Sequence, residues 1–101
     1  MVMHGSETLY IEELKRKLLP ILKEHNVIRA GIFGSVAEGI VRETSDVDII
    51  VEFAGKKSLF DLVALKLDME SAVKRNIDLS TYKALNPLIR KKILEQEVRV
   101  L

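Results

Sequence analysis

The sequence has 101 residues, a formal net charge of +1, 48% hydrophobic and 31% charged residues, and no cysteine. This length suits a single domain over residues 1–101 that buries roughly two-thirds of its unfolded surface, and the composition excludes a disordered chain. The absence of cysteine excludes disulfides and thiolate chemistry, and it fits a reducing, cytoplasmic compartment. The near-neutral charge gives no reason to expect direct nucleic-acid binding, and no apolar run is long enough to cross a membrane.

The first predicted element is a helix, because apolar residues recur at helical spacing from Ile11 to Leu22. Pro20 lacks an amide hydrogen, so we expect it to kink or split this helix. Two segments rich in β-branched residues follow, and each predicts a strand. They are Val27–Phe33, which Gly34 ends, and Val47–Phe53, and we expect them to pair at the centre of a sheet.

Two further helices are predicted from their starting residues. Ser58 followed three residues later by Asp61 is a helix N-cap pattern, and the apolar residues after it favour a helix that ends near Lys74. Asn86 as N-cap with Pro87 at the first helical position opens a last helix, through about residue 95. The remaining segments are a third strand over 77–81 and a short extended tail over 98–101.

The most informative motif is Gly34-Ser35 followed by Asp46-Val47-Asp48. Side chains two residues apart on a strand project from the same face, so Asp46 and Asp48 can share a divalent metal ion. The Gly34-Ser35 turn follows an apolar run, and its free backbone N–H groups can face a polyphosphate. Magnesium binds through one or two carboxylates plus substrate phosphates, so the two pieces together predict a nucleotide site.

This arrangement resembles the nucleotidyltransferase superfamily typified by DNA polymerase beta, and closely its minimal nucleotidyltransferases (MNT), which occur beside HEPN-domain partners in prokaryotes. The family pattern is Gly-Ser, a second glycine, Asp-x-Asp at the start of a strand, and a third Asp on a later strand. The resemblance runs from about Leu14 to Leu101, and it implies an α/β nucleotidyltransferase fold whose small mixed β-sheet has helices packed mainly on one face. The matching positions are Gly34, Ser35, Gly39, Asp46, Asp48 and Asp78.

The resemblance implies nucleotidyl transfer with ATP as substrate and two Mg²⁺ ions about 3.5–4 Å apart. Asp46 and Asp48 would bridge the ions. Asp78 would complete the acceptor-side ion, either taking the acceptor proton or only holding the metal. The family pattern also implies that the Ser35 hydroxyl and adjacent backbone N–H groups hold the β- and γ-phosphates. Gly34 would let the backbone approach them without a Cβ clash, and Gly39 would permit a turn after a short helix.

Three functions follow from the resemblance. The first is transfer of AMP from ATP to a hydroxyl of an HEPN-domain toxin, which makes this chain an antitoxin enzyme, because 101 residues leave little protein to bind a small acceptor. The second is a binding-only antitoxin or assembly subunit, suggested by Glu38, which stands where many relatives carry arginine. The third is a small-molecule adenylyltransferase that acts as a homodimer, and a homo-oligomer stays open.

Other polar and aromatic residues favour structural roles. His25 lies near the end of the first helix, where a cation suits the helix dipole, so we expect it to be structural rather than catalytic. Arg90-Lys91-Lys92 reads as a solvated helix face, with contact to phosphate or an acidic partner as the alternative. A single tyrosine does not make a nucleic-acid platform, although stacking of a base on Tyr82 stays open.

Overall fold

The computed structural model describes residues 3–34 and 46–101, with side chains from residue 11 onward. A four-stranded mixed sheet lies at its centre, in the strand order β3-β2-β1-β4. The pair β1–β2 is antiparallel, β2–β3 is parallel and β1–β4 is antiparallel. The elements in chain order are α1 (Met3–Glu24), β1 (Val27–Phe33), β2 (Val47–Phe53), α3 (Leu59–Val73), β3 (Ile77–Thr81), the 3₁₀ helix η1 (Tyr82–Ala84), α4 (Pro87–Gln96) and β4 (Val98–Arg99).

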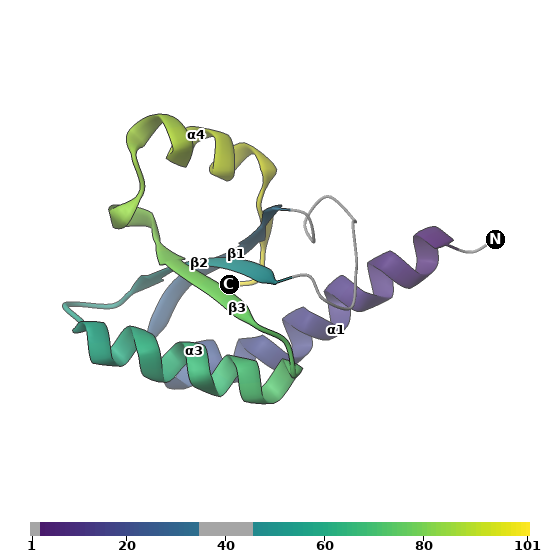
Figure 1. The fold of residues 1–101 in the computed structure, drawn as a ribbon, viewed down its shortest axis with the longest axis horizontal. Helices are drawn as coiled ribbons and strands as arrows, with labels where there is room; N and C mark the ends of the chain where they lie inside the picture. Colours follow the sequence, from purple (N-terminus) through teal and green to yellow (C-terminus); the bar gives the residue numbers. More distant parts are fainter. Residues whose placement is uncertain (1–2, 35–45) are drawn as a thin grey trace.

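The helices lie on both faces of the sheet, with two of them on one side. Figure 1 shows α1 and α3 together below the sheet and α4 on the opposite side. The predicted α/β fold, with helices mainly on one face, is therefore confirmed, and the predicted bounds of the strands and of the two later helices hold to within about a residue. No helix in the described part of the chain has the length and apolar character that a membrane span needs.

The side chains of β2 point alternately to the two faces of the sheet. Val47, Ile49 and Val51 are fully buried in the main core, together with leucines and methionine from α1 and α3. Ile50 points the other way and belongs to a smaller cluster with Tyr82 and with Ile93 of α4. Because side chains alternate along a strand, Asp48 shares the α4 side of the sheet with Ile50.

The prediction that Pro20 splits the first helix is wrong. Helix α1 runs without interruption from Met3 to Glu24, with Pro20 inside it. A proline in a helix interior costs about 3 kcal/mol or more, because it removes one hydrogen bond and crowds the preceding turn. On the opposite face Leu18 and Leu22 are fully buried, and each such side chain contributes about 1.5–3 kcal/mol. Packing of α1 on the sheet therefore outweighs the local cost.

The helix starts agree in detail with the residues that predict them. Ser58 caps α3 by accepting a hydrogen bond from the backbone N–H of Asp61, while the Asp61 carboxylate accepts from the N–H of Ser58 at 2.8 Å. At α4, the side chain of Asn86 accepts from the N–H of Leu88 at 2.9 Å, and Pro87 occupies the first helical position. Local sequence therefore sets where both helices begin.

A buried charged cluster joins the C-terminal segment to the sheet on the α4 side. Glu97, just after α4, accepts hydrogen bonds from the Tyr82 hydroxyl at 2.7 Å and from the Arg29 guanidinium at 3.2 Å. The guanidinium also lies 4.4 Å from the centre of the Tyr82 ring. Gly31 makes room for this arrangement, because a Cβ there would run into the Glu97 carboxylate. The short extended tail after Glu97 then pairs with β1 as β4, at Gly31 and Ile32.

Replacement of Glu97 by alanine should lower the free energy of unfolding by about 2–3 kcal/mol, because it leaves a partly buried guanidinium and a buried phenol without their acceptor. The Glu97 side chain is only 4% exposed and that of Arg29 33%, so water replaces the lost contacts only in part. Chemical denaturation of Glu97→Ala measures the loss. Glu97→Gln, which keeps the size and an acceptor oxygen, should cost less, and equal losses for the two variants would contradict the charged hydrogen bonds.

Candidate active site

Asp48 and Asp78 lie side by side on neighbouring strands. In the parallel pairing of β2 with β3, Asp48 is the direct partner of Asp78. Residues on either side of Asp78, namely Ile77 and Leu79, pack in the main core, so the Asp78 side chain projects from the α4 side, as Asp48 does. Adjacent strands are about 4.8 Å apart, which brings two aligned carboxylates into contact. The predicted juxtaposition of these two residues is present in the structure.

The surroundings of Asp48 disfavour its negative charge. Partial burial raises the pKa of the Asp48 carboxyl, and the charge of Asp78 raises it further. A hydrogen bond that Asp48 and Asp78 share when one is protonated acts in the same direction, and the charge of Asp46 adds to it. Asp46 is exposed and lies just before β2, and Asp78 is exposed on β3. Two neighbouring carboxylates thus act on Asp48, which is the most enclosed of the three.

Gly34 closes the site on the side of β1. It follows Phe33, which pairs directly with Asp48, and its φ of 75° lies in the left-handed region that favours glycine. A Cβ at Gly34 would run into Oδ2 of Asp48. Any side chain here would therefore displace the central carboxylate. Ser35, Gly39 and Glu38 lie outside the described residues, so their predicted roles stay predictions.

The donor set fits a magnesium ion bound in its usual way. Mg²⁺ is a hard cation that takes one or two carboxylates and fills its remaining positions with water and substrate phosphates. Asp48 and Asp78 offer two adjacent carboxylates whose mutual repulsion a divalent cation would relieve. Within residues 3–34 and 46–101, no three acidic, histidine or cysteine side chains gather as a complete protein-only metal site. The arrangement therefore suits a metal that arrives with a nucleotide.

The remaining candidates take structural positions. His25 lies between α1 and β1, and its Nε2 is 2.7 Å from Oδ2 of Asp68 on α3, so it joins two helices as expected of a structural residue. Tyr82 is only 7% exposed, and Arg29 lies over its ring, which speaks against stacking of a base there. Arg90 donates to the carbonyl oxygen of Leu85 at 3.3 Å and is half-buried, so the Arg90-Lys91-Lys92 cluster is solvated only at its two lysines.

Sequence reasoning missed the cluster around Glu97 and a lysine-bearing cavity near the end of β2. A signal for the first was available, because Arg29 interrupts an otherwise apolar strand and a charge there needs a partner. That partner is 68 residues away in the sequence, so its identity could not be read from spacing.

The raised pKa of Asp48 predicts a pH-dependent cost to stability. The folded protein holds this proton more tightly than the unfolded chain, so the penalty is absent below the usual pKa of 3.8 and grows as the pH rises through the raised pKa. Without metal or ATP, Asp48→Asn should therefore unfold at a higher temperature than the wild type at pH 7, and this gain should vanish near pH 3. Thermal melts across this pH range test it.

Asp61→Asn is the control with the opposite sign. Hydrogen bonds from the backbone and side chain of Ser58 lower the pKa of Asp61, so its charge contributes stability above the usual pKa of 3.8 that is lost in acid. Asp61→Asn should therefore be less stable than the wild type at pH 7. A loss of stability at pH 7 for both variants would contradict the electrostatic account of Asp48.

Comparison with known families and proteins agrees with this geometry. Residues 16–101 match the family described as polymerase beta, nucleotidyltransferase. A Methanocaldococcus jannaschii protein assigned as a protein adenylyltransferase is 50% identical over 91 residues, which cover 90% of this chain and 98% of the relative. The protein adenylyltransferase MntA of Thermococcus cleftensis is 33% identical over 96 residues, covering 91% of this chain and 97% of the relative.

Solved structures share the fold. A protein assigned as a minimal nucleotidyltransferase superposes with a TM-score of 0.78 at 33% identity, covering 91% of this chain and 92% of that one. A complex of a tri-AMPylated HEPN toxin from Shewanella oneidensis with its MNT antitoxin contains a chain with a TM-score of 0.70. At 17% identity over 89% of this chain and 71% of that one, this second likeness shows the fold alone.

Taken with the carboxylate pair beside Gly34, these matches show that the chain belongs to the polymerase beta-type nucleotidyltransferases. Within that family it is an enzyme of the adenylyltransferase group, and the resemblance to minimal nucleotidyltransferases is confirmed.

Proposed function

We propose that this chain is a Mg²⁺-dependent enzyme that transfers AMP from ATP to a hydroxyl group of an HEPN-domain partner, and that it acts as the antitoxin of a toxin–antitoxin pair in the cytoplasm. The observation that carries the proposal is the direct pairing of Asp48 with Asp78 next to the Gly34 turn. Two comparisons support the choice of acceptor. Relatives are named protein adenylyltransferases, and a complex that contains a chain of the same fold joins an AMPylated HEPN toxin to its MNT antitoxin.

The reaction is a substitution at the α-phosphorus of ATP. A bond forms between the acceptor oxygen and the α-phosphorus, the bond to pyrophosphate breaks, and the proton of the acceptor hydroxyl leaves. Bound magnesium would be held by Asp48 and Asp78, with Asp46 as the third carboxylate that the family pattern predicts, and it would supply stabilisation of the charge on the phosphates and on the attacking oxygen.

The residues of the chain divide this work by position. Asp48 lies between the other groups, with Gly34 on the β1 side and Asp78 on the β3 side. The Gly34 turn, with Ser35 after it, would receive the β- and γ-phosphates on the β1 side. Asp78 is then the carboxylate nearest the incoming hydroxyl, where it would accept the proton or orient the oxygen.

A large acceptor can reach Asp78 because β3 is an edge strand. The sheet order ends at β3, and the Asp78 side chain is exposed. Within the described residues no further strand pairs with the outer edge of β3, so a folded protein can present a hydroxyl-bearing side chain there. Binding of the acceptor as a protein also supplies positioning, which is worth several kcal/mol of the barrier.

Magnesium and ATP should bind together and weakly alone, because the ion needs phosphate oxygens to complete its coordination. Isothermal titration calorimetry with ATP should show much tighter binding when magnesium is present. Asp48→Asn should remove most of this difference, whereas Asp68→Asn, which removes a charge on α3 across the sheet, should retain it. Equal ATP affinity with and without magnesium would contradict the site.

The purified chain should label an HEPN-domain partner with AMP from labelled ATP and magnesium, but not free nucleosides or aminoglycosides. Label should appear on a hydroxyl-bearing side chain of the partner. Asp46→Ala combined with Asp48→Ala should abolish the label, a fall of several orders of magnitude, while the two proteins still form a complex. If the wild type binds and suppresses the partner with no AMP incorporated, the chain is a binding-only antitoxin. If it labels a small molecule instead, the third function holds.

A further inference from the structure

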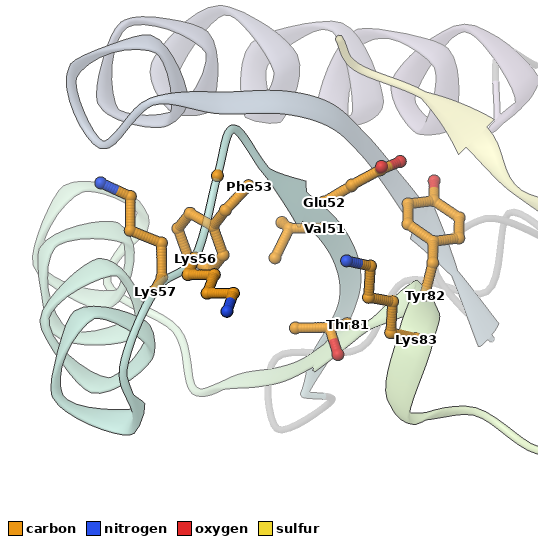
Figure 2. A pocket seen from close by; sticks show the side chains of 9 residues that line it. Val51, Glu52, Phe53, Lys56, Lys57, Thr81, Tyr82 and Lys83 are labelled. Carbon is orange, nitrogen blue, oxygen red and sulfur yellow. The ribbon is translucent and has the colours of Figure 1, made fainter.

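A hollow lies at the end of β2 that is remote from Asp48. It is a cavity of about 370 Å³ between the end of β2, the loop before α3 and the segment where β3 leads into η1 (Figure 2). Phe53 gives it an apolar wall next to the buried Val51, and Lys56, Lys57 and Lys83 surround it. The volume falls in the range of sites that bind small molecules or short peptide segments, and it is about ten times the volume that one water molecule occupies.

The charge around this cavity is mainly positive. Figure 2 shows the ammonium groups of Lys56 and Lys83 turned inward from opposite sides, while that of Lys57 points away. Among the described residues that line the cavity, Glu52 is the only acidic one, and its carboxylate points away from both inward lysines. In the described part of the chain neither Lys56 nor Lys83 forms an ion pair. Two facing cations repel each other, so an anion between them would be stabilised.

The start of α3 does not itself supply the anion site. The N–H of Ser58 already donates to Asp61, whose carboxylate occupies the position that a bound anion would take at a helix N-terminus. Recognition in the cavity therefore falls to the two inward lysines and the apolar wall.

The cavity lies on the acceptor side of the proposed active site. Thr81, which lines it, is three residues after Asp78 along β3, a distance of about 10 Å in an extended strand. Gly34, by contrast, follows β1, which pairs with β2 on the side opposite β3, and it lies near the end of β2 that carries Asp48. Phosphates bound at the Gly34 turn would thus lie away from Lys56 and Lys83. The adenine base of ATP is neutral, so it does not explain a cavity with two cations.

We propose that this cavity binds an acidic side chain of the acceptor protein, about three residues along an extended segment from the hydroxyl that receives AMP. This inference rests on the proposed function and adds a specificity determinant to it. The spacing follows from the distance along β3, and the apolar wall favours a side chain with its adjoining backbone over a bare inorganic ion.

Binding can be measured without catalysis. In the absence of ATP and magnesium, the ¹⁵N-labelled full chain is titrated with the peptide acetyl-Tyr-Ala-Ala-Glu-Glu-amide, with its Gln-Gln counterpart, and with inorganic phosphate. The acidic peptide should shift the backbone amide signals of Gly55, Lys56 and Lys83, and the Gln-Gln peptide should not. Lys56→Glu combined with Lys83→Glu should lower the affinity for the acidic peptide at least about tenfold.

A matched control variant has the same change in net charge as the Lys56→Glu, Lys83→Glu variant but lies elsewhere on the surface. Lys23→Glu combined with Lys66→Glu alters two exposed lysines of α1 and α3, across the sheet from α4, and should leave peptide affinity within about twofold. Amide shifts from phosphate as large as those from the acidic peptide would overturn the proposal in favour of a small-anion site. The absence of shifts with every probe, or an equal response to the Gln-Gln peptide, would also overturn it.

The same variants separate this inference from the proposed function. In an AMP-transfer assay with the acidic peptide, Lys56→Glu with Lys83→Glu should raise KM at least about tenfold, with kcat changed little. Peptides with one or four alanines between tyrosine and the first glutamate should be labelled less well than the peptide with two. Peptide binding at the cavity, with no AMP transfer to the HEPN-domain partner itself, would refute the enzymatic function and leave the binding site standing. AMP transfer at the same rate to peptides with and without the acidic residues would refute the binding site and leave the enzymatic function standing.

Discussion

The repulsion between Asp48 and Asp78 is the constraint around which this structure is arranged. Two carboxylates on adjacent strands disfavour each other's charge, and the pairing of β2 with β3 holds them in direct register nonetheless. A shift of either strand by one residue would turn its own aspartate into the core, so the buried Val47, Ile49 and Ile77 fix the register from the opposite face. The core therefore stabilises a charge arrangement that would otherwise separate, which is the condition that a metal-dependent site requires.

Charged groups on the α4 side of the sheet fall into two kinds. Arg29, Glu97 and Tyr82 satisfy one another, because a cation, an anion and a hydroxyl donor meet in one buried cluster. Within the described residues, Asp48 with Asp78 is a pair of like charges without an opposite charge in contact. The first kind is structural, since it joins the segment after α4 to β1 and η1. The second is arranged to bind a ligand of opposite charge. The two inward lysines of the cavity at the far end of β2 are likewise a pair of like charges.

Much of the fold followed from local signals. The Ser58 and Asn86 caps located both later helices because capping depends on residues only two or three positions apart. The Pro20 prediction failed because a local rule was applied where long-range packing of Leu18 and Leu22 decides the outcome. The Asp48–Asp78 pair was predictable only through the family pattern, since strand spacing alone does not say which strands are neighbours or in which register. The pairing of Arg29 with Glu97 and the cavity between β2 and η1 depend on tertiary contacts that no short motif records.

Two glycines in β1 and at its end decide which carboxylates approach the sheet. Gly31 admits Glu97, and Gly34 admits Asp48, and in each case a Cβ would occupy the position of a carboxylate oxygen. The sequence alone suggested that Gly34 gives phosphates access to the backbone, but the structure adds that it also sets the position of Asp48. Under the proposed function, this one residue would serve both the phosphate side and the metal side of the site. A substitution at Gly34 would consequently disturb both together, whereas Gly31 affects only the buried cluster that holds the C-terminal segment.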